Sequence, residues 1–422
     1  MADVTANQHT ASWFARRLRR IRRMAAYRVA WCVPQWGLSE FLYTVGTLLT
    51  LRAVRGSHPQ AFATSVARSL GRRFGLPLNR ARYALQLVME ALGIGQGDDV
   101  VVPSYICESV IDAIFAVGAR PVLADVAEDL NISVDTVVAA LTPRTRCVIV
   151  PHLFGKAAPI AAIERAIGHL GIAIIDDAAQ SFGATCEGRP IGSFGIAGVV
   201  ACGAGKALAG AAGAVLVTDD LHIRNFVGAR SAGNEAQDTV LRRLASHWIW
   251  RRFRLHTLAF EPMFRKYFPE KERLTGPAGA ANIDAAIGEC QLRSSAKRAR
   301  RRRENSALVA PLFLERGIRV VETFSPDGVA LKLVAELPPS ALALHEVIEV
   351  MADAGIECQG GYTPYHIAHA ERATQMGVAQ LPNTDVLWTR ILCVPVERAA
   401  PTGRLSRALN RILSGDRVLS VD

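Results

Sequence analysis

Apolar residues recur along the chain in two alternating patterns. Segments such as DDVVVPS (98–104), RCVIVPH (146–152) and IAIIDDAAQ (172–180) are short and mostly apolar, which is typical of buried strands. Segments such as RYALQLVMEALGIG (82–95) and APIAAIERAIGHLG (158–171) carry apolar residues at helical spacing and end at glycine. Strands that alternate with helices in this way predict a mostly parallel central sheet with helices on both faces. The expected fold class is therefore α/β.

Four stretches of the chain differ in composition, and we take them as its domain organisation. Residues 1–70 are arginine-rich and then apolar, which predicts an N-terminal arm. Residues 71–235 carry the strand–helix alternation and are expected to form a large α/β domain. Residues 236–275 are basic and aromatic, which predicts an insertion, and residues 276–422 begin as a long helix and continue as a smaller α/β unit. A chain of 422 residues is long enough to bury two cores.

The chain carries 49 Lys and Arg against 38 Asp and Glu, a formal charge of +11, which favours an anionic partner. No nucleic-acid recognition motif accompanies the basic runs, so we do not expect that partner to be nucleic acid. Residues 15–51 and 247–268 combine arginines with apolar or aromatic residues, which suits peripheral contact with a membrane surface. Packing of these stretches on the protein body is the alternative. The run KRARRRR at 297–303 predicts a solvated helix face.

Eight cysteines are scattered without a C-x-x-C pair, so neither a disulfide framework nor a metal site is expected. Reduced cysteines favour a cytoplasmic location, with peripheral attachment to the inner face of the cell membrane as a further expectation. The apolar stretch at 41–51 is about half as long as a bilayer span requires. Arg28, Pro34 and Glu40 interrupt the apolar pattern that a signal peptide needs.

Lys206 lies in the stretch ACGAGKALAG between two predicted strands. A Walker phosphate loop would need a glycine at Val200 and a hydroxyl at Ala207, so that interpretation fails. Covalent binding of an aldehyde cofactor such as pyridoxal 5′-phosphate (PLP) needs a lysine, and a carboxylate that keeps the pyridine nitrogen protonated. The strand that ends in IIDDAAQ can supply that carboxylate, and Asp177, 29 residues before the lysine, is the better candidate. Both residues would lie beyond the carboxyl ends of strands, where parallel sheets bind ligands.

Five successive motifs resemble one enzyme family: GIGQGDDVVVPSY, AIFAVGARPVLADV, LTPRTRCVIVPHLFG, IAIIDDAAQSFGATCEGRPIGSFG and GKALAGAAGAVLVTDD. Over roughly residues 75–412 the chain is similar to the DegT/DnrJ/EryC1/StrS sugar aminotransferases. The resemblance implies the type I PLP-dependent aminotransferase fold, PLP as cofactor and a homodimer with sites at the subunit interface. It also implies transfer of an amino group from glutamate to a nucleotide-linked keto-sugar, in the biosynthesis of cell-surface glycans or secondary metabolites.

The resemblance assigns roles to five residues. Lys206 matches the lysine that bonds to the cofactor and moves the proton, and Asp177 matches the carboxylate on the pyridine nitrogen. Gln180 matches a glutamine near the phenolic oxygen of the cofactor. Ala81 and Arg82 fall where the family begins a helix whose backbone amides hold the phosphate, a role that helix N-termini suit.

Three positions depart from the family pattern. The usual phosphate-binding serine, five residues before the lysine, is Ala201, and the usual asparagine after the lysine is Ala207. The aromatic residue that often stacks on the cofactor is replaced near Cys107, where Tyr105 is close enough in sequence to substitute. We expect the cofactor to be held by other residues or held more weakly. Cys107 has two interpretations, a reactive thiol or a small buried residue.

Three residues are candidates for substrate contact. His152 follows a strand and either faces the site or serves as a structural hydrogen-bonding residue. Tyr362 and His366 lie in GYTPYHIAH, where the C-terminal unit of the family often meets its substrate. Two further functions stay open: a PLP enzyme that acts on a non-sugar cyclic ketone, and a degenerate family member that serves as a membrane-associated scaffold or regulatory subunit. The lysine itself argues against the dehydratases of the family, which carry histidine at that position.

Overall fold

The computed structural model describes most of the chain, and the predicted insertion at 236–275 lies outside the described residues. The 247–268 stretch, which was one candidate for membrane contact, lies outside them as well. So does most of the other candidate stretch, 15–51, of which 38–49 is described. The described residues are 38–49, 58–203, 205–209, 213–231, 276, 278–378 and 380–414.

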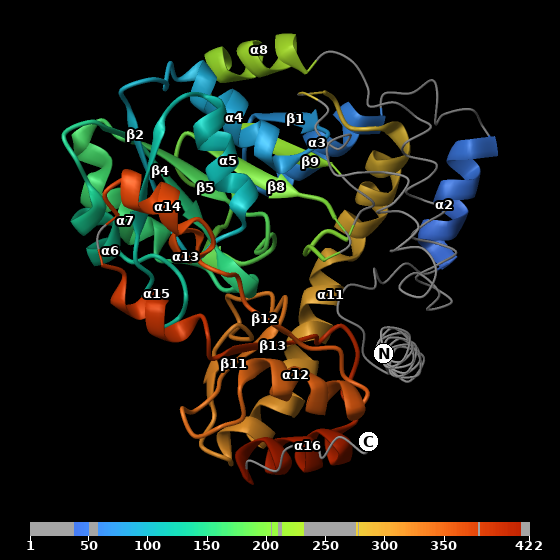
Figure 1. Ribbon diagram of the computed structural model, residues 1–422. Helices are drawn as coiled ribbons and strands as arrows, with labels where there is room; N and C mark the ends of the chain where they lie inside the picture. The colour runs from blue at the N-terminus through green and yellow to red at the C-terminus, as the bar shows by residue number, and fades with distance from the viewer. Residues whose placement is uncertain are drawn as a thin grey trace, which may run out of the picture.

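A seven-stranded sheet with the order β1-β9-β8-β5-β4-β2-β3 forms the centre of the large domain (Figure 1). All pairs from β8 to β3 are parallel, whereas β9 runs antiparallel to its neighbours β8 and β1. The predicted α/β class with a mostly parallel sheet is therefore confirmed. The strands are β1 (Phe74–Leu78), β2 (Asp99–Pro103), β3 (Arg120–Ala124), β4 (Thr145–Pro151), β5 (Ala173–Asp177), β8 (Ala197–Ala201) and β9 (Ala214–Thr218).

Side chains of the inner strands alternate between two cores, one on each face of the sheet. In β4, Val148 and Val150 belong to one core, and Cys147 and Ile149 belong to the other. The first core is completed by α3, α6, α7 and the long helix α11, and the second by α4, α5 and α8. These helices are α3 (His58–Ser69), α4 (Ala81–Ala91), α5 (Glu108–Ala116), α6 (Val134–Ala140), α7 (Ile160–Ile167), α8 (Leu221–Arg230) and α11 (Asn282–Leu314).

Local sequence signals set the ends of several elements. Ser133 caps the start of α6, because its hydroxyl accepts the backbone N–H of Thr136 at 3.2 Å and the Thr136 hydroxyl accepts the N–H of Ser133 in return. Such a capping box satisfies two helix donors that would otherwise have no partner. The remaining short elements of the large domain are η1 (Leu153–Gly155), η2 (Gly168–Leu170) and the two-stranded sheet of β6 (Thr185–Cys186) and β7 (Arg189–Pro190).

The end of the predicted N-terminal arm, residues 58–70, packs into the core of the large sheet. Phe62 and Val66 of α3 are buried in that core. The helix approaches β1 so closely that a Cβ on Gly75 would lie 2.0 Å from the Ala63 carbonyl oxygen. Only glycine fits at this position, and a strand forms here although glycine and proline within FGLPL argue against one.

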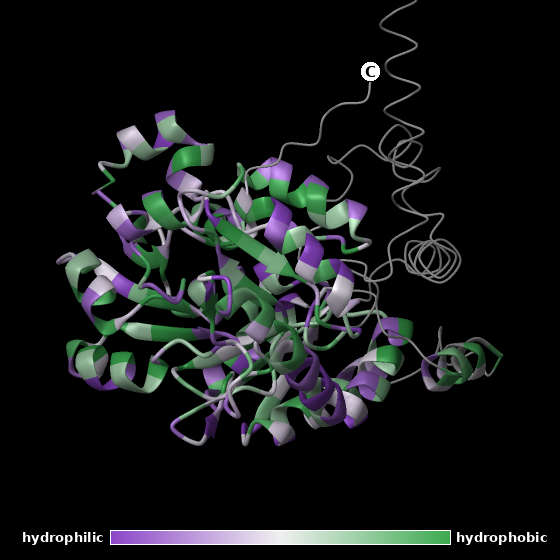
Figure 2. Ribbon diagram, turned by 90° about the horizontal axis from the view of Figure 1, so that it is seen from below, coloured by the Kyte–Doolittle hydropathy of each residue, from purple (hydrophilic) through white to green (hydrophobic). Residues whose placement is uncertain are grey.

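Helix α2 (Leu38–Leu49) lies against α11 at the margin of the described molecule (Figure 1). Its Glu40 is buried and accepts hydrogen bonds from Gln291 Nε2 at 2.7 Å and from Arg298 at 2.9 Å. Residues with hydrophobic colouring also occupy much of α2 in Figure 2. Among the described helices, none is both long and apolar enough to cross a membrane.

A four-stranded antiparallel sheet with the order β10-β11-β13-β12 forms the smaller C-terminal unit. Phe313, near the end of α11, is fully buried in its core, so this 33-residue helix contributes to both units. The elements are β10 (Arg319–Val321), β11 (Leu333–Glu336), β12 (Gln359–Gly360), β13 (Ile391–Val394), α12 (Leu344–Asp353) and α16 (Thr402–Ser414).

The basic run at 297–303 is solvated only in part, so that prediction was incomplete. Arg300 and Arg301 are exposed on α11. Arg302 is 3% exposed, and its Nε donates to the Val329 carbonyl at 3.0 Å. The helix therefore uses one side of the arginine run to bind the loop before β11.

Residues 361–387, which we call the clasp, leave the small sheet after β12 and lie on the large domain (Figure 1). Tyr365 and Leu381 of the clasp are buried in the second core of the large sheet. Asp125, just beyond β3, accepts the backbone N–H of Thr384 at 2.8 Å. The clasp therefore fastens the small unit beside the carboxyl ends of the strands. Its helices are α13 (Tyr365–Ala368), α14 (Ala370–Gln375) and α15 (Pro382–Leu387).

Candidate active site

A cavity of about 310 Å³, here called the catalytic cavity, opens beyond the carboxyl ends of β4, β5 and β8. Ligands of parallel sheets bind at this edge because the loops there diverge. The wall of the cavity brings together seven of the ten predicted site residues: Lys206, Asp177, Gln180, His152, Cys107, Ala81 and Arg82.

Asp177 is the last residue of β5 and is 6% exposed. Its Oδ1 accepts the backbone N–H of Ala179 at 3.0 Å. Burial raises the pKa of the Asp177 carboxyl, and the hydrogen bond from Ala179 and the positive charge of Lys206 act against that shift. A cationic group that entered the cavity beside Asp177 would favour the ionised carboxylate.

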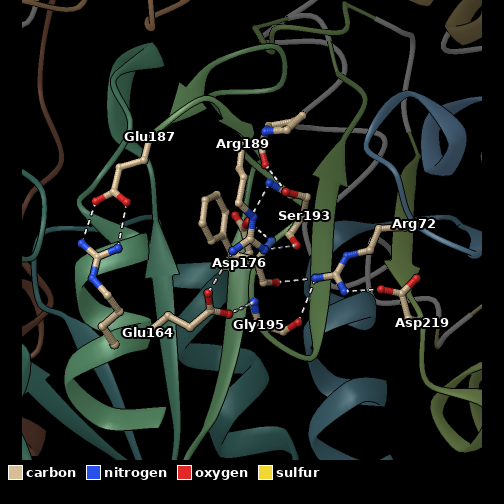
Figure 3. Close-up of polar contacts among 12 residues, drawn as sticks. Arg72, Glu164, Asp176, Glu187, Arg189, Ser193, Gly195 and Asp219 are labelled. Atoms are coloured by element: carbon tan, nitrogen blue, oxygen red, sulfur yellow. Dashed lines mark hydrogen bonds and ion pairs between the residues drawn. The ribbon is translucent and has the colours of Figure 1, made fainter.

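Asp176, its neighbour in the sequence, is committed to the fold instead (Figure 3). Its Oδ2 accepts the backbone N–H groups of Gly192 at 2.6 Å and Phe194 at 3.0 Å. Its Oδ1 lies 2.9 Å from His152 Nε2. With these partners Asp176 is satisfied within the protein, so Asp177 is the carboxylate available to a ligand.

His152 lines the cavity but has both ring nitrogens occupied. Its Nδ1 accepts the backbone N–H of Ala158 at 2.9 Å, so its Nε2 carries the proton and donates to Asp176. A histidine held in this way can present its ring to a ligand, but neither nitrogen is available for proton transfer. The structure therefore supports the hydrogen-bonding interpretation of His152.

Lys206 occupies a turn between β8 and β9. Its backbone N–H donates to the Gly203 carbonyl at 2.9 Å, and the Gly203 N–H donates to Leu208 at 3.2 Å. The side chain is partly exposed and reaches the cavity wall. Within the described part of the chain its ammonium group makes no hydrogen bond, so it is available for chemistry.

Helix α4 begins at the cavity wall with Ala81 and Arg82. The residue before the helix, Arg80, has an extended backbone and provides no side-chain cap. Within the described residues no side chain is seen to cap the backbone N–H groups of Ala81 and Arg82, which suits an anionic group such as phosphate. Asn79 and Arg80 also line the cavity and were not predicted, although their position just before a predicted helix was a usable signal.

Gln180 is fixed by two hydrogen bonds. Its Oε1 accepts the backbone N–H of Phe154 at 3.0 Å, and its Nε2 donates to the Tyr362 hydroxyl at 2.8 Å. The bond from Phe154 determines the orientation of the amide, which leaves a second N–H on Nε2 for a ligand. Tyr362 does not line the cavity and acts on it through Gln180. Burial raises the pKa of the Tyr362 hydroxyl, which stays protonated.

Two further predicted site residues, like Tyr362, are not part of the cavity wall. Tyr105 is fully buried, with its ring 5.9 Å from that of Tyr362, so the structure does not place it for stacking on a cavity ligand. His366 joins the clasp to the large domain, with Nδ1 2.7 Å from Ser104 Oγ and Nε2 2.7 Å from Asp385. Tyr105 of the large domain therefore contacts the clasp, and His366 of the clasp contacts the large domain. Neither residue lines the cavity.

The positions that depart from the family pattern leave the wall less polar. Ala201 lines the cavity and offers only a methyl group, whereas Ala207 is buried in the core behind it. Cys107 lines the cavity before α5, with its Sγ 3.2 Å from Ser109 Oγ. Ser109 also lines the cavity, so it offers a hydroxyl near this part of the wall.

The residues of the cavity fit PLP. Lys206 offers the amine, Asp177 a buried carboxylate for a protonated ring nitrogen, and the uncapped start of α4 a place for the phosphate. In the described ranges no three histidine, cysteine or acidic side chains are grouped so that they could hold a metal ion.

Comparisons with curated proteins identify aminotransferases. The chain is 32% identical over 192 residues to L-glutamine:2-deoxy-scyllo-inosose aminotransferase of Streptomyces kanamyceticus, covering 43% of this chain and 45% of the relative. It is 33% identical over 199 residues to UDP-N-acetyl-3-dehydro-alpha-D-glucosamine 3-aminotransferase of Acidithiobacillus ferrooxidans. This match covers 46% of this chain and 54% of the relative. The chain thus matches about half the length of these relatives.

Solved structures share the fold over nearly the whole chain. The aminotransferase TlmJ of Streptoalloteichus hindustanus has a TM-score of 0.71 at 22% identity and covers 90% of this chain and 99% of its own. The E. coli GDP-4-keto-6-deoxy-D-mannose-3-dehydratase, solved with bound hydrated PLP, has a TM-score of 0.74 at 18% identity. The match covers 92% of this chain and 99% of the dehydratase chain. A family model matches residues 45–412, and the chain therefore belongs to the DegT/DnrJ/EryC1/StrS aminotransferase family.

Proposed function

We propose that this protein is a PLP-dependent aminotransferase that transfers an amino group to a nucleotide-linked keto-sugar. The observation that carries the proposal is the convergence of Lys206, Asp177 and the start of α4 on one cavity. Family membership and the fold of the PLP-bound neighbour support it.

Bound PLP would serve as an electron sink for the carbon from which the proton leaves. Lys206 Nζ, the one amine in the described wall, would attach the cofactor and then take and return the substrate proton. Asp177 would pair with the protonated ring nitrogen, and Gln180 would donate its free N–H to the phenolic oxygen. Ala81 and Arg82 would hold the phosphate through their backbone amides.

The keto-sugar assignment rests on the Acidithiobacillus relative, whose name gives a UDP-linked 3-dehydro sugar as substrate. Glutamate is the proposed amino donor, and the proposed setting is glycan or secondary-metabolite biosynthesis in the cytoplasm. A homodimer is part of the same proposal.

A non-sugar cyclic ketone is the second candidate substrate. The Streptomyces kanamyceticus relative and a second relative from Streptomyces griseus, 33% identical over 171 residues, are named for inososes and for L-glutamine as donor. Both substrate classes present a ketone on a six-membered ring with several hydroxyls, so the same site chemistry serves either.

A half-reaction distinguishes these candidates. Purified protein would be loaded with pyridoxamine 5′-phosphate and mixed with a UDP-linked keto-sugar or with scyllo-inosose. The proposal predicts that the sugar nucleotide converts the cofactor to PLP, seen as a rise in visible absorbance, and that inosose reacts more slowly. Faster reaction with inosose would favour the second candidate. A colourless protein that cannot be reconstituted with PLP would contradict both and favour a scaffold.

Peripheral membrane contact through α2 is a further part of the proposal. Leu38, Leu42 and Leu49 are 71%, 58% and 79% exposed and, at spacings of four and seven residues, share one helix face. Such a face suits insertion among lipid headgroups. Sedimentation with anionic vesicles should fall in Leu42→Asp and at high salt, while PLP binding is unchanged. Equal sedimentation of the variant would overturn this part.

A further inference from the structure

A second cavity, of about 400 Å³, lies at the free edge of the large sheet, and we call it the edge cavity. It is formed by α3, β1 and α8, and β1 is the last strand on that side. Among the residues that the structure describes, it shares no lining residue with the catalytic cavity, and none of those that line it is acidic. Its polar side chains come from Gln60, Thr64, Arg73, Arg224 and Asn225.

Two guanidinium groups are held against one aromatic ring in this cavity. The Arg73 guanidinium carbon lies 5.2 Å from the centroid of the Phe74 ring, and that of Arg224 lies 5.8 Å from the same centroid. Because both distances are measured to the same centroid, the two guanidinium carbons are at most 11.0 Å apart, the sum of 5.2 and 5.8 Å. Arg224 comes from α8, so the fold brings it to β1, and contact with the ring restricts both side chains.

Neither guanidinium group forms an ion pair with a carboxylate within the described part of the chain, although the positive charge of Arg73 helps to lower the pKa of Asp219. Asp219 lies near the cavity, and its Oδ2 accepts a hydrogen bond from Arg72 Nη1 at 2.8 Å (Figure 3). Its Oδ1 accepts the backbone N–H of Arg73 at 2.7 Å. The hydrogen bond of Arg224 goes to the neutral Oδ1 of Asn225 at 2.7 Å. That bond orients the Asn225 amide so that its NH₂ group is left to donate.

We propose that the edge cavity binds the phosphate group of a second ligand, with Arg73 and Arg224 as the residues that recognise it. The forked donors of a guanidinium match phosphate oxygens, and two forks on one ring provide such donors from two directions. The phosphate belongs either to a soluble metabolite or to a lipid headgroup. The site is independent of the proposed activity, so failure of one leaves the other standing.

Binding of inorganic pyrophosphate to the PLP-loaded protein, followed by calorimetry, tests the soluble source. Vesicles that contain phosphatidylglycerol test the lipid source. We expect the double variant Arg73→Gln/Arg224→Gln to weaken either pyrophosphate binding or vesicle binding at least tenfold. The interaction that weakens identifies the source of the phosphate. Arg230→Gln is the matched control, because Arg230 is an exposed arginine of α8 outside the edge cavity. Its guanidinium carbon lies 3.6 Å from the centroid of a different ring, that of Phe226. The control variant should change either interaction less than twofold.

Chemical labelling of the unmodified sequence provides a readout that does not depend on folding of a variant. Phenylglyoxal reacts with accessible arginines, and mass spectrometry assigns each labelled position. The ligand identified above should slow the labelling of Arg73 and Arg224 and leave that of Arg230 unchanged. Equal binding by the double variant, or equal labelling with and without ligand at these two positions, would overturn the proposal.

Discussion

At the residue scale, the two adjacent aspartates at the end of β5 have opposite tasks. Asp176 accepts three hydrogen bonds from the protein, whereas Asp177 faces the catalytic cavity with one. The sequence favoured Asp177 as the cofactor carboxylate, first from its place at a strand end and then through family resemblance. The pattern IIDD alone does not distinguish them, because two of the donors to Asp176 come from a loop 16 and 18 residues away and the third, His152, lies 24 residues earlier.

Asp177→Asn should stabilise the protein without cofactor while it weakens cofactor binding. Burial raises the pKa of Asp177 in the folded protein above its value in the unfolded chain. The ionised carboxylate therefore destabilises the fold above the folded-state pKa, and this cost is absent below the unfolded-state pKa. Thermal unfolding of the cofactor-free variant should therefore occur at a higher temperature than that of the parent near pH 8, with the gain lost near pH 4. PLP affinity should fall about tenfold or more.

Asp176→Asn is the matched control for that experiment. It loses acceptor capacity toward three donors, so it should lower the unfolding temperature at the same pH. If Asp177→Asn proved the less stable of the two, the assignment of Asp177 as the available carboxylate would be wrong.

His152→Phe should destabilise the fold by about 2–5 kcal/mol. The change leaves the Ala158 N–H and Asp176 Oδ1 buried without a partner, and each such loss costs about 1–3 kcal/mol. Urea unfolding measures the effect. His345→Phe, at an exposed position on α12, should stay within about 0.5 kcal/mol of the parent, and a similarly small effect at His152 would contradict its structural role.

At the element scale, the strand–helix alternation between β2 and β9 was predictable because each buried strand is a short apolar run between turn residues. The contribution of α3 and β1 to the core was not. Gly75 and Pro77 argue against a strand, yet the close approach of Ala63 requires a glycine, and an edge strand tolerates a proline. The burial of Arg302 was equally hidden, since its partner is a carbonyl 27 residues away.

Glu40→Ala should release α2 from α11. The pair of Glu40 with Arg298 is buried, with side-chain exposures of 3% and 13%, and removal of one partner of such a pair costs about 3 kcal/mol or more. Amide hydrogen exchange should accelerate over 38–49. Glu304→Ala is the control: its pair with Arg300 at 3.6 Å is exposed, and its loss should cost less than about 1 kcal/mol. Unchanged exchange in Glu40→Ala would rule out this docking role.

At the scale of the whole molecule, the catalytic cavity depends on contacts between segments far apart in the sequence. Tyr362 reaches Gln180 across 182 residues, and His366 reaches Ser104 across 262. The sequence indicated both clasp residues as candidates near the site, but as substrate contacts. Their contacts with Gln180 and Ser104 follow from packing of the small unit onto the large sheet, which no local pattern encodes.

The central claim is that Lys206 is the residue to which the cofactor attaches. Borohydride reduction of the PLP-loaded protein, followed by peptide mass spectrometry, tests it most directly, because reduction makes the attachment permanent. We predict a phosphopyridoxyl label on the peptide that contains Lys206, and no label there in Lys206→Ala. Lys156, which is paired with Asp129 at 3.2 Å outside the cavity, should stay unlabelled. A protein without label, or with its label on Lys156, would contradict the account.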